Sequence, residues 1–217
     1  MARETGIRAV LFDVGGVLTV PLRETLDIIA ARGVVDVADA GRHFRETFIG
    51  GHDGDDPSHK LERGEMSMND FLATLGDSRH AVWQLLHPDS PDSLHNNMTS
   101  HSGMHQLVDE ARVAGYKTAI VSNIFNEYLV RWDEITNHVG RFDSVVYSCV
   151  IGMRKPNRAI FDFTLGALDV KPDEAVLIDD SPEVIKAAAA IGLRTIWVDD
   201  HDEAIASARR LLNIPNH

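Results

Sequence analysis

The chain has 217 residues, of which 44% are hydrophobic and 25% charged, and its net charge is −12 at pH 7. This composition is typical of a globular protein, and the acidic balance argues against binding to nucleic acid or anionic membranes. The single cysteine excludes an intrachain disulfide. No signal peptide or apolar run of membrane-spanning length is present, so we expect a cytoplasmic protein.

Short β-rich runs alternate with helical patterns along most of the chain. The expected strands are Ile7–Phe12, Tyr116–Ser122, Ser144–Ser148, Ala175–Asp180 and Arg194–Asp199. The expected helices are Met104–Ala114, 125–135, Ala159–Leu168, Pro182–Ile191 and Glu203–Leu212. Strands that alternate with helices of this length predict a Rossmann-like α/β core of three layers, with a parallel sheet in the middle.

Residues 21–95 depart from this alternation, because they contain helical patterns but no convincing strand. The patterns are Leu22–Ala31, Val37–Ile49 and short pieces around Leu61, Phe71 and Val82–Leu86. The linker Pro88–Gly103 is rich in Pro, Ser, Asn, His and Asp, which is typical of a hinge or surface loop. We therefore predict a core of residues 1–20 and 96–217, with a helical unit, residues 21–95, inserted after the first strand.

Polar residues stand where the expected strands end, and ligands of open parallel α/β sheets bind beyond the carboxyl ends of the strands. They are Asp13 after the first strand, Ser122 and Asn123 at the second, Arg154 and Lys155 in the loop GMRKP after the third, and Asp179 and Asp180 at the fourth. Each of them alone has an ordinary explanation, such as a turn, a helix cap or a surface lysine. Their shared position predicts that they converge on one crevice.

The acidic residues of this set predict a cation site. Converging carboxylates repel each other unless a cation lies among them, and their oxygens suit Mg²⁺. Lys155 can bind a phosphoryl oxygen, and Ser122 and Asn123 can donate to another. Backbone N–H groups of the loop Val14–Gly16 can hold an anion, because glycine permits close approach. With the cation in place, Asp13 can attack phosphorus and form an aspartyl-phosphate.

The ordered set FDVGGVLT, SN, GMRKP and LIDDSPEVIKAA resembles the haloacid dehalogenase-like (HAD) hydrolase superfamily, most of whose members are phosphatases. The likeness covers nearly the whole chain, and the insertion matches the place of the helical cap in one subgroup. The stretches LERGEMSMNDFLATLG and SCVIGMRKPNRAIFDFTLGAL look most like sugar-phosphate phosphatases with a DxGxV motif and the N-terminal phosphatase domains of epoxide hydrolases.

The resemblance implies roles for individual residues. Asp13 matches the nucleophile, Ser122 the second motif and Lys155 the third. The implied Mg²⁺ ligands are Asp13, the Gly15 carbonyl, Asp180 and, directly or through water, Asp179. Arg154 either binds the substrate or braces its loop through a carboxylate.

Gly15 departs from the family pattern, because typical phosphatases of the family have an aspartate there that protonates the leaving oxygen and then activates water. General acid–base help is typically worth about 10²–10⁴-fold in rate. Three alternatives stay open: the proton comes from the insertion or from water, the enzyme is slow or prefers good leaving groups such as an anomeric sugar phosphate, or the domain binds phosphorylated ligands without turnover. The candidate proton sources in the insertion are His52, Asp53, Asp55 and His59.

Together these observations predict a Mg²⁺-dependent hydrolase of small phosphate monoesters that acts through an aspartyl-phosphate on Asp13. A small phosphorylated metabolite is the expected partner, with a sugar phosphate as the first choice, and the assembly is a monomer or homodimer. A haloacid dehalogenase is the alternative enzyme, since it also uses an aspartate nucleophile. It needs no Mg²⁺, however, which leaves the pair Asp179–Asp180 without a purpose.

Overall fold

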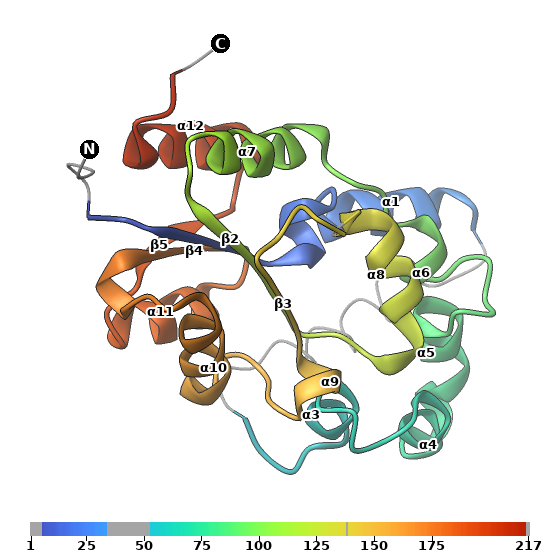
Figure 1. Ribbon diagram of the computed structural model, residues 1–217. Coiled ribbons are helices and arrows are strands. Elements are labelled where there is room, and N and C mark those ends of the chain that lie inside the picture. Colours follow the sequence, from blue (N-terminus) through green and yellow to red (C-terminus); the bar gives the residue numbers. More distant parts are fainter. Residues whose placement is uncertain (1–5, 34–52, 138, 216–217) are drawn as a thin grey trace.

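The computed structural model describes residues 6–33, 53–137 and 139–215. A parallel five-stranded sheet lies at its centre, in the order β3-β2-β1-β4-β5 (Figure 1). The strands are β1 (Ala9–Phe12), β2 (Lys117–Ser122), β3 (Ser144–Tyr147), β4 (Ala175–Asp179) and β5 (Arg194–Trp197). Their ends lie within about two residues of the predicted ones, so the parallel α/β core is confirmed.

Four long helices cover the sheet, as the alternation of strands and helices predicts. They are α7 (Ser102–Val113), α10 (Arg158–Leu168), α11 (Pro182–Ala190) and α12 (His201–Leu212). Successive strand residues point to opposite faces: Ala9 and Leu11 pack in the cluster that includes α10 and α11, whereas Val10 and Phe12 pack in the cluster that includes α7 and α12. Figure 1 shows these two helix pairs on opposite sides of the sheet.

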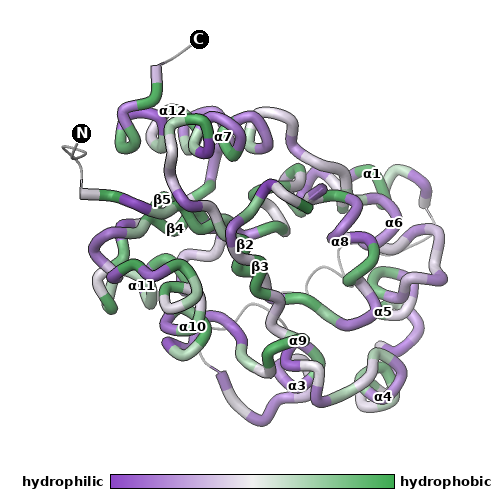
Figure 2. Tube along the Cα trace, viewed as in Figure 1, coloured by the Kyte–Doolittle hydropathy of each residue, from purple (hydrophilic) through white to green (hydrophobic). Residues whose placement is uncertain are grey.

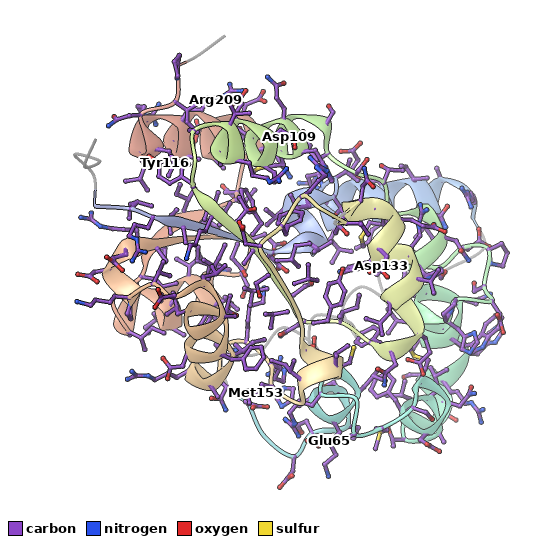
Figure 3. All side chains as sticks on the ribbon, viewed as in Figure 1. Glu65, Asp109, Tyr116, Asp133, Met153 and Arg209 are labelled. Atoms are coloured by element: carbon purple, nitrogen blue, oxygen red, sulfur yellow. The ribbon has the colours of Figure 1, made fainter. Side chains whose placement is uncertain are left out.

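The helices α7 and α12 lie side by side and are joined by polar contacts. Figure 2 shows hydrophobic and hydrophilic residues mixed along both helices, as expected when one face packs on the sheet. Arg209 of α12 donates through Nε to Glu110 Oε2 of α7 at 2.8 Å (Figure 3). Tyr116 donates its hydroxyl to the Leu212 carbonyl at 2.7 Å, which ties the start of β2 to the end of α12.

The described chain between Pro21 and the start of α7 is helical, as the sequence predicts. Its helices are α1 (Leu22–Ala31), α3 (Pro57–Glu62), α4 (Met68–Ala73), α5 (Arg79–Leu86) and α6 (Leu94–Asn97). We call this part of the chain the helical insertion. The predicted helix Val37–Ile49 lies outside the described residues, and the division of the chain at residues 21 and 95 into core and cap stays a prediction.

Two short helices after the strands complete the side of the molecule that faces the insertion. They are α8 (Leu129–Thr136), which follows β2, and α9 (Ser148–Ile151), which follows β3. Three single 3₁₀ turns connect the larger elements, at Gly76–Ser78, Asn126–Tyr128 and Pro172–Glu174. Within the described ranges, none of the helices has both the length and the apolar character that crossing a membrane requires.

Candidate active site

A cavity of about 250 Å³ lies at the carboxyl ends of the strands, with walls from both the sheet and the helical insertion. The predicted site residues that line it are Asp13, Gly15, Asn123, Arg154, Lys155, Asp179 and Asp180. Val14 and Ser122 are not part of the lining. The convergence expected from the strand ends is therefore observed for most of the set.

Asp13 is placed by the sheet itself. Its backbone N–H donates to the Ile178 carbonyl at 3.0 Å, which continues the pairing of β1 with β4 by one residue. The side chain then turns into the cavity, where Oδ1 accepts a hydrogen bond from the Val14 N–H at 2.7 Å. Oδ2 lies 3.0 Å from Lys155 Nζ. The carboxylate is thus held at both oxygens before any ligand binds.

Lys155 lies between two carboxylates, with Nζ 3.0 Å from Asp13 Oδ2 and 2.6 Å from Asp179 Oδ2. Burial lowers the pKa of this amine, but Asp13 and Asp179 outweigh burial and hold the pKa above its ordinary value, so the side chain stays charged. Asn123 fixes the backbone of the lysine, since its Nδ2 donates to the Lys155 carbonyl at 2.9 Å and its Oδ1 accepts from the Lys155 N–H at 2.8 Å.

The three aspartates form an acidic cluster that fits a divalent cation. One carboxylate oxygen from each of Asp13, Asp179 and Asp180 lies within 4.8 Å of the others. Burial raises the pKa of both Asp179 and Asp180, and the charge of Asp13 raises it further. One ammonium, that of Lys155, faces three carboxylates, so negative charge remains uncompensated. A hard cation with oxygen ligands, such as Mg²⁺, would relieve this repulsion.

The backbone requires glycine at only one of the two positions Gly15 and Gly16. Gly16 has φ +70°, and a Cβ atom there would lie 2.2 Å from Asp180 Oδ2, so only glycine lets the loop pack against the acidic cluster. Gly15 has φ −62° and ψ 125°, which any residue can adopt. A Cβ atom on Gly15 would meet only Trp132 Cζ2, at 4.0 Å. The backbone therefore does not require glycine at the position of the usual acid.

Several expected phosphate donors have partners within the protein. The Val14 N–H donates to Asp13 Oδ1, as described, and the Gly16 N–H donates to Thr19 Oγ1 at 2.8 Å. Ser122 is buried, and its Oγ accepts a hydrogen bond from Trp132 Nε1 at 3.3 Å. In this arrangement these groups shape the loop and the cavity wall.

Arg154 has the carboxylate contacts expected of a residue that braces its loop, and because it also lines the cavity, binding of the substrate by this residue stays a prediction. Its Nε donates to Glu62 Oε2 at 2.6 Å, and both side chains are buried, with 2% and 8% of their surfaces exposed. Nη1 also lies 4.0 Å from Asp53 Oδ1. The arginine therefore braces its loop through carboxylates of the helical insertion.

Three of the proton sources expected in the insertion, Asp53, Asp55 and His59, lie within the described residues and do not line the cavity. Asp53 is paired with Arg63, His59 is buried and accepts the Gly54 N–H at Nδ1 over 3.1 Å, and Asp55 is exposed. His52 lies outside the described residues. The carboxyl group that the insertion does bring to the cavity is Glu62. No motif marks this residue in the sequence, because its position depends on how α3 packs against α9.

Much of the cavity lining is apolar. Its aliphatic and aromatic residues are Leu22, Leu86, Leu94, Met98, Ile124, Phe125, Tyr128, Trp132 and Val184. The two of them with polar tips have partners already, since Tyr128 donates to the Leu86 carbonyl at 2.7 Å and Trp132 donates to Ser122. Their rings can therefore offer apolar faces to a ligand. Helical periodicity does not distinguish such residues from ordinary core residues.

Comparison with known families gives a match over residues 7–192, to the haloacid dehalogenase-like hydrolases. The chain belongs to this family. Two solved structures share the HAD fold over most of its length. A HAD-like family hydrolase of Porphyromonas gingivalis has a TM-score of 0.70 and 27% identity, over 96% of this chain and 99% of its own. A HAD family enzyme of Bacteroides thetaiotaomicron, solved with magnesium and inorganic phosphate, has a TM-score of 0.62 and 19% identity. The match covers 91% of this chain and 98% of that enzyme.

Three relatives match this chain over more than nine-tenths of its length. Acyl-CoA dehydrogenase family member 10 of Mus musculus is 31% identical over 97% of this chain and 20% of its own length. Bifunctional epoxide hydrolase 2 of Rattus norvegicus is 26% identical over 94% of this chain and 39% of its own length. The chain thus spans less than half of either protein. Sesquiterpene phosphatase astK of Aspergillus oryzae is 25% identical over 96% of this chain and 98% of its own length. The expected likeness to HAD phosphatases and epoxide hydrolases is confirmed.

Proposed function

We propose that this HAD hydrolase cleaves phosphate monoesters in a Mg²⁺-dependent reaction that passes through an aspartyl-phosphate on Asp13. The observation that carries the proposal is the placement of Asp13 beside Lys155 and within the acidic cluster, in a cavity at the strand ends. The phosphatase names among its relatives and the magnesium and phosphate bound by a protein of the same fold support this choice.

In the proposed reaction, the Asp13 carboxylate attacks phosphorus and the ester oxygen leaves. Mg²⁺, held by Asp13, Asp179, Asp180 and the Gly15 carbonyl, would neutralise the phosphoryl charge next to the nucleophile. Lys155 keeps the Asp13 carboxylate oriented and supplies a second positive charge for phosphoryl oxygens. Water then attacks the phosphorus of the aspartyl-phosphate, and Asp13 is released as the free carboxylate.

The acidic cluster also favours a phosphatase over a dehalogenase. A dehalogenase has a carbon electrophile and no metal requirement, so buried carboxylates beside the nucleophile would only repel its charge. A phosphatase uses the same carboxylates to hold the cation that its anionic substrate requires.

We further propose that the alcohol part of the substrate is apolar, in place of the sugar expected from the sequence. Nine aliphatic and aromatic residues line the cavity, and the hydroxyl and indole N–H among them are bonded within the protein. Recognition of a sugar requires polar groups for its hydroxyls. A relative named as a sesquiterpene phosphatase agrees with an apolar substrate.

Hydrolysis of p-nitrophenyl phosphate tests the general claim, because its leaving group needs little help from an acid. We expect turnover with millimolar Mg²⁺, loss of turnover with EDTA, and recovery when Mg²⁺ is added again. The measurement is the release of p-nitrophenolate, followed by its absorbance at about 405 nm, and the proposal requires that turnover depends on Mg²⁺. Absence of turnover in the presence of Mg²⁺ would contradict it.

A series of alkyl phosphates tests the apolar cavity. Each methylene that leaves water is worth about 0.8 kcal/mol, so kcat/KM should rise about threefold to fourfold per methylene from butyl to octyl phosphate. Phosphate release from octyl phosphate and glucose 6-phosphate is compared under the same conditions. A preference for the sugar phosphate would contradict the apolar assignment and leave the phosphatase proposal intact.

A further inference from the structure

Among the described residues that line the cavity, one carboxyl group has no place in the acidic cluster. The lining carboxyl groups are Asp13, Glu62, Asp179 and Asp180. Three of these belong to the nucleophile and its cation site, which leaves Glu62. This residue comes from the helical insertion and lines the same cavity as Gly15, which stands where a proton donor is usual.

The backbone of Glu62 is held firmly on the core. It is the last residue of α3, and its carbonyl accepts a hydrogen bond from Ser148 Oγ at 2.6 Å, at the start of α9. Two residues on, Gly64 packs so closely that a Cβ atom there would lie 2.4 Å from the Cys149 carbonyl oxygen. Because the segment meets the core at these points, the Glu62 side chain has a defined position over the cavity.

The surroundings of Glu62 hold the pKa of its carboxyl group close to neutral pH. Burial raises its pKa, Arg154 and Lys155 lower it, Asp13 raises it, and the pKa lies at about 7. A proton donor works best when its pKa is close to the working pH. Arg154, bonded to Oε2 at 2.6 Å, also stabilises the carboxylate that remains after the proton has left.

We propose that Glu62 donates the proton to the leaving oxygen of the substrate and later accepts one from the attacking water. This inference rests on the proposed phosphatase function. It makes Glu62 the catalytic residue that replaces the usual acid at the position of Gly15, supplied by the helical insertion and not by the nucleophile loop.

The two steps balance in atoms and charge. In the first, a bond forms between Asp13 Oδ and phosphorus, the bond from phosphorus to the ester oxygen breaks, and the Glu62 proton goes to that oxygen to give the alcohol. In the second, Glu62 takes a proton from water, the resulting hydroxide attacks phosphorus, and the electron pair of the breaking bond returns to Asp13. Glu62 is then protonated again, and inorganic phosphate leaves.

Glu62→Gln tests the proposal with two substrates, octyl phosphate and p-nitrophenyl phosphate, whose leaving groups differ in how much they need a proton. Glutamine keeps the size and can still accept from Arg154, but it cannot donate a proton as an acid. We expect kcat/KM for octyl phosphate to fall about 10²–10⁴-fold. For p-nitrophenyl phosphate, kcat/KM should change less than about threefold, since kcat/KM reports the step in which this good leaving group departs without an acid.

Glu65→Gln is the matched control, because Glu65 lies three residues away at the outer edge of the molecule (Figure 3), paired with Arg63 and outside the cavity lining. It should leave both substrates unaffected. Gly15→Asp in the Glu62→Gln background is the rescue variant, since the backbone at Gly15 accepts a side chain. Recovery of octyl phosphate turnover by at least about tenfold is expected.

The pH profile gives an independent readout. The charged groups acting on Glu62 are Arg154 and Lys155 of the loop after α9 and Asp13 after β1. A proton donor must be protonated, so kcat/KM for octyl phosphate should fall as the pH rises through about 7. That descending limb should be absent from the profile of Glu62→Gln.

The outcomes separate this inference from the function on which it rests. If Glu62→Gln lowers kcat/KM equally for both substrates, or leaves octyl phosphate unaffected, Glu62 is not the proton donor, and the phosphatase proposal stands. If the native protein with Mg²⁺ cleaves neither substrate, the phosphatase proposal fails, and the role of Glu62 fails with it. Circular dichroism melting curves exclude misfolding as the cause of any loss.

Discussion

Asp13→Asn is expected to lower kcat for p-nitrophenyl phosphate by about 10³-fold or more, the order of loss seen when a covalent nucleophile is removed. Asparagine keeps the shape of the side chain and can still accept from the Val14 N–H. It cannot attack phosphorus as a carboxylate, and it removes one negative charge beside Lys155. Turnover with Mg²⁺ is measured for the variant and the native protein at equal concentrations.

Asp109→Asn serves as the control for this change. Asp109 lies on α7, is paired with Arg141 at the surface and does not line the cavity (Figure 3). Its replacement should leave turnover within about twofold, as surface substitutions usually do. Native-like turnover by Asp13→Asn would mean that another group attacks phosphorus, and the aspartyl-phosphate mechanism would then be wrong.

Gly16→Ala is the second change with a large expected effect, although it adds only a methyl group. The new Cβ would lie 2.2 Å from Asp180 Oδ2 and 2.8 Å from Asp180 Cγ, so the carboxylate or the loop must move. A misplacement of about 1 Å at a catalytic site costs on the order of 10²-fold in rate. The left-handed backbone at φ +70° adds about 1–2 kcal/mol of destabilisation for a residue with a Cβ.

Gly166→Ala separates the effect of the site from that of the substitution. Gly166 lies inside α10, where an added Cβ meets nothing within 4 Å, so alanine should stabilise the helix by about 0.5–1 kcal/mol and leave turnover unaffected. Both variants are compared by turnover and by the Mg²⁺ concentration that gives half-maximal rate. We expect that concentration to rise for Gly16→Ala, and an unchanged Mg²⁺ dependence would contradict the placement of Asp180 in the cation site.

In the proposed mechanism, the combination of Gly15 with Glu62 distinguishes this protein from phosphatases that carry both acid and nucleophile on one loop. When the two groups come from different parts of the chain, proton transfer depends on the helical insertion being seated on the core. The contacts of Glu62 and Gly64 with α9 are among those that hold it there. Substitutions at this contact should therefore affect alkyl phosphates more than aryl phosphates.

The core and its acidic groups could be predicted from the sequence, because the responsible signals are local. Strands of a parallel sheet, buried on both faces, appear as apolar runs, and the parallel topology brings their carboxyl ends to one edge. Asp13 and the pair Asp179–Asp180 stand at the ends of such runs, and Lys155 lies in the loop GMRKP, which follows the third strand and a short helix. Their convergence therefore required no knowledge of side-chain packing.

Only the tertiary structure decided what surrounds Asp13. Glu62 and most of the apolar lining come from helices whose periodicity looks the same whether a face is packed or lines a cavity. The partners of Arg154 and Ser122 likewise depend on which segments meet after folding, over distances in sequence that local patterns do not encode. The proposed nucleophile and cation site thus follow from the sequence, whereas the proposed proton donor and the apolar character of the cavity follow from how the insertion packs on the core.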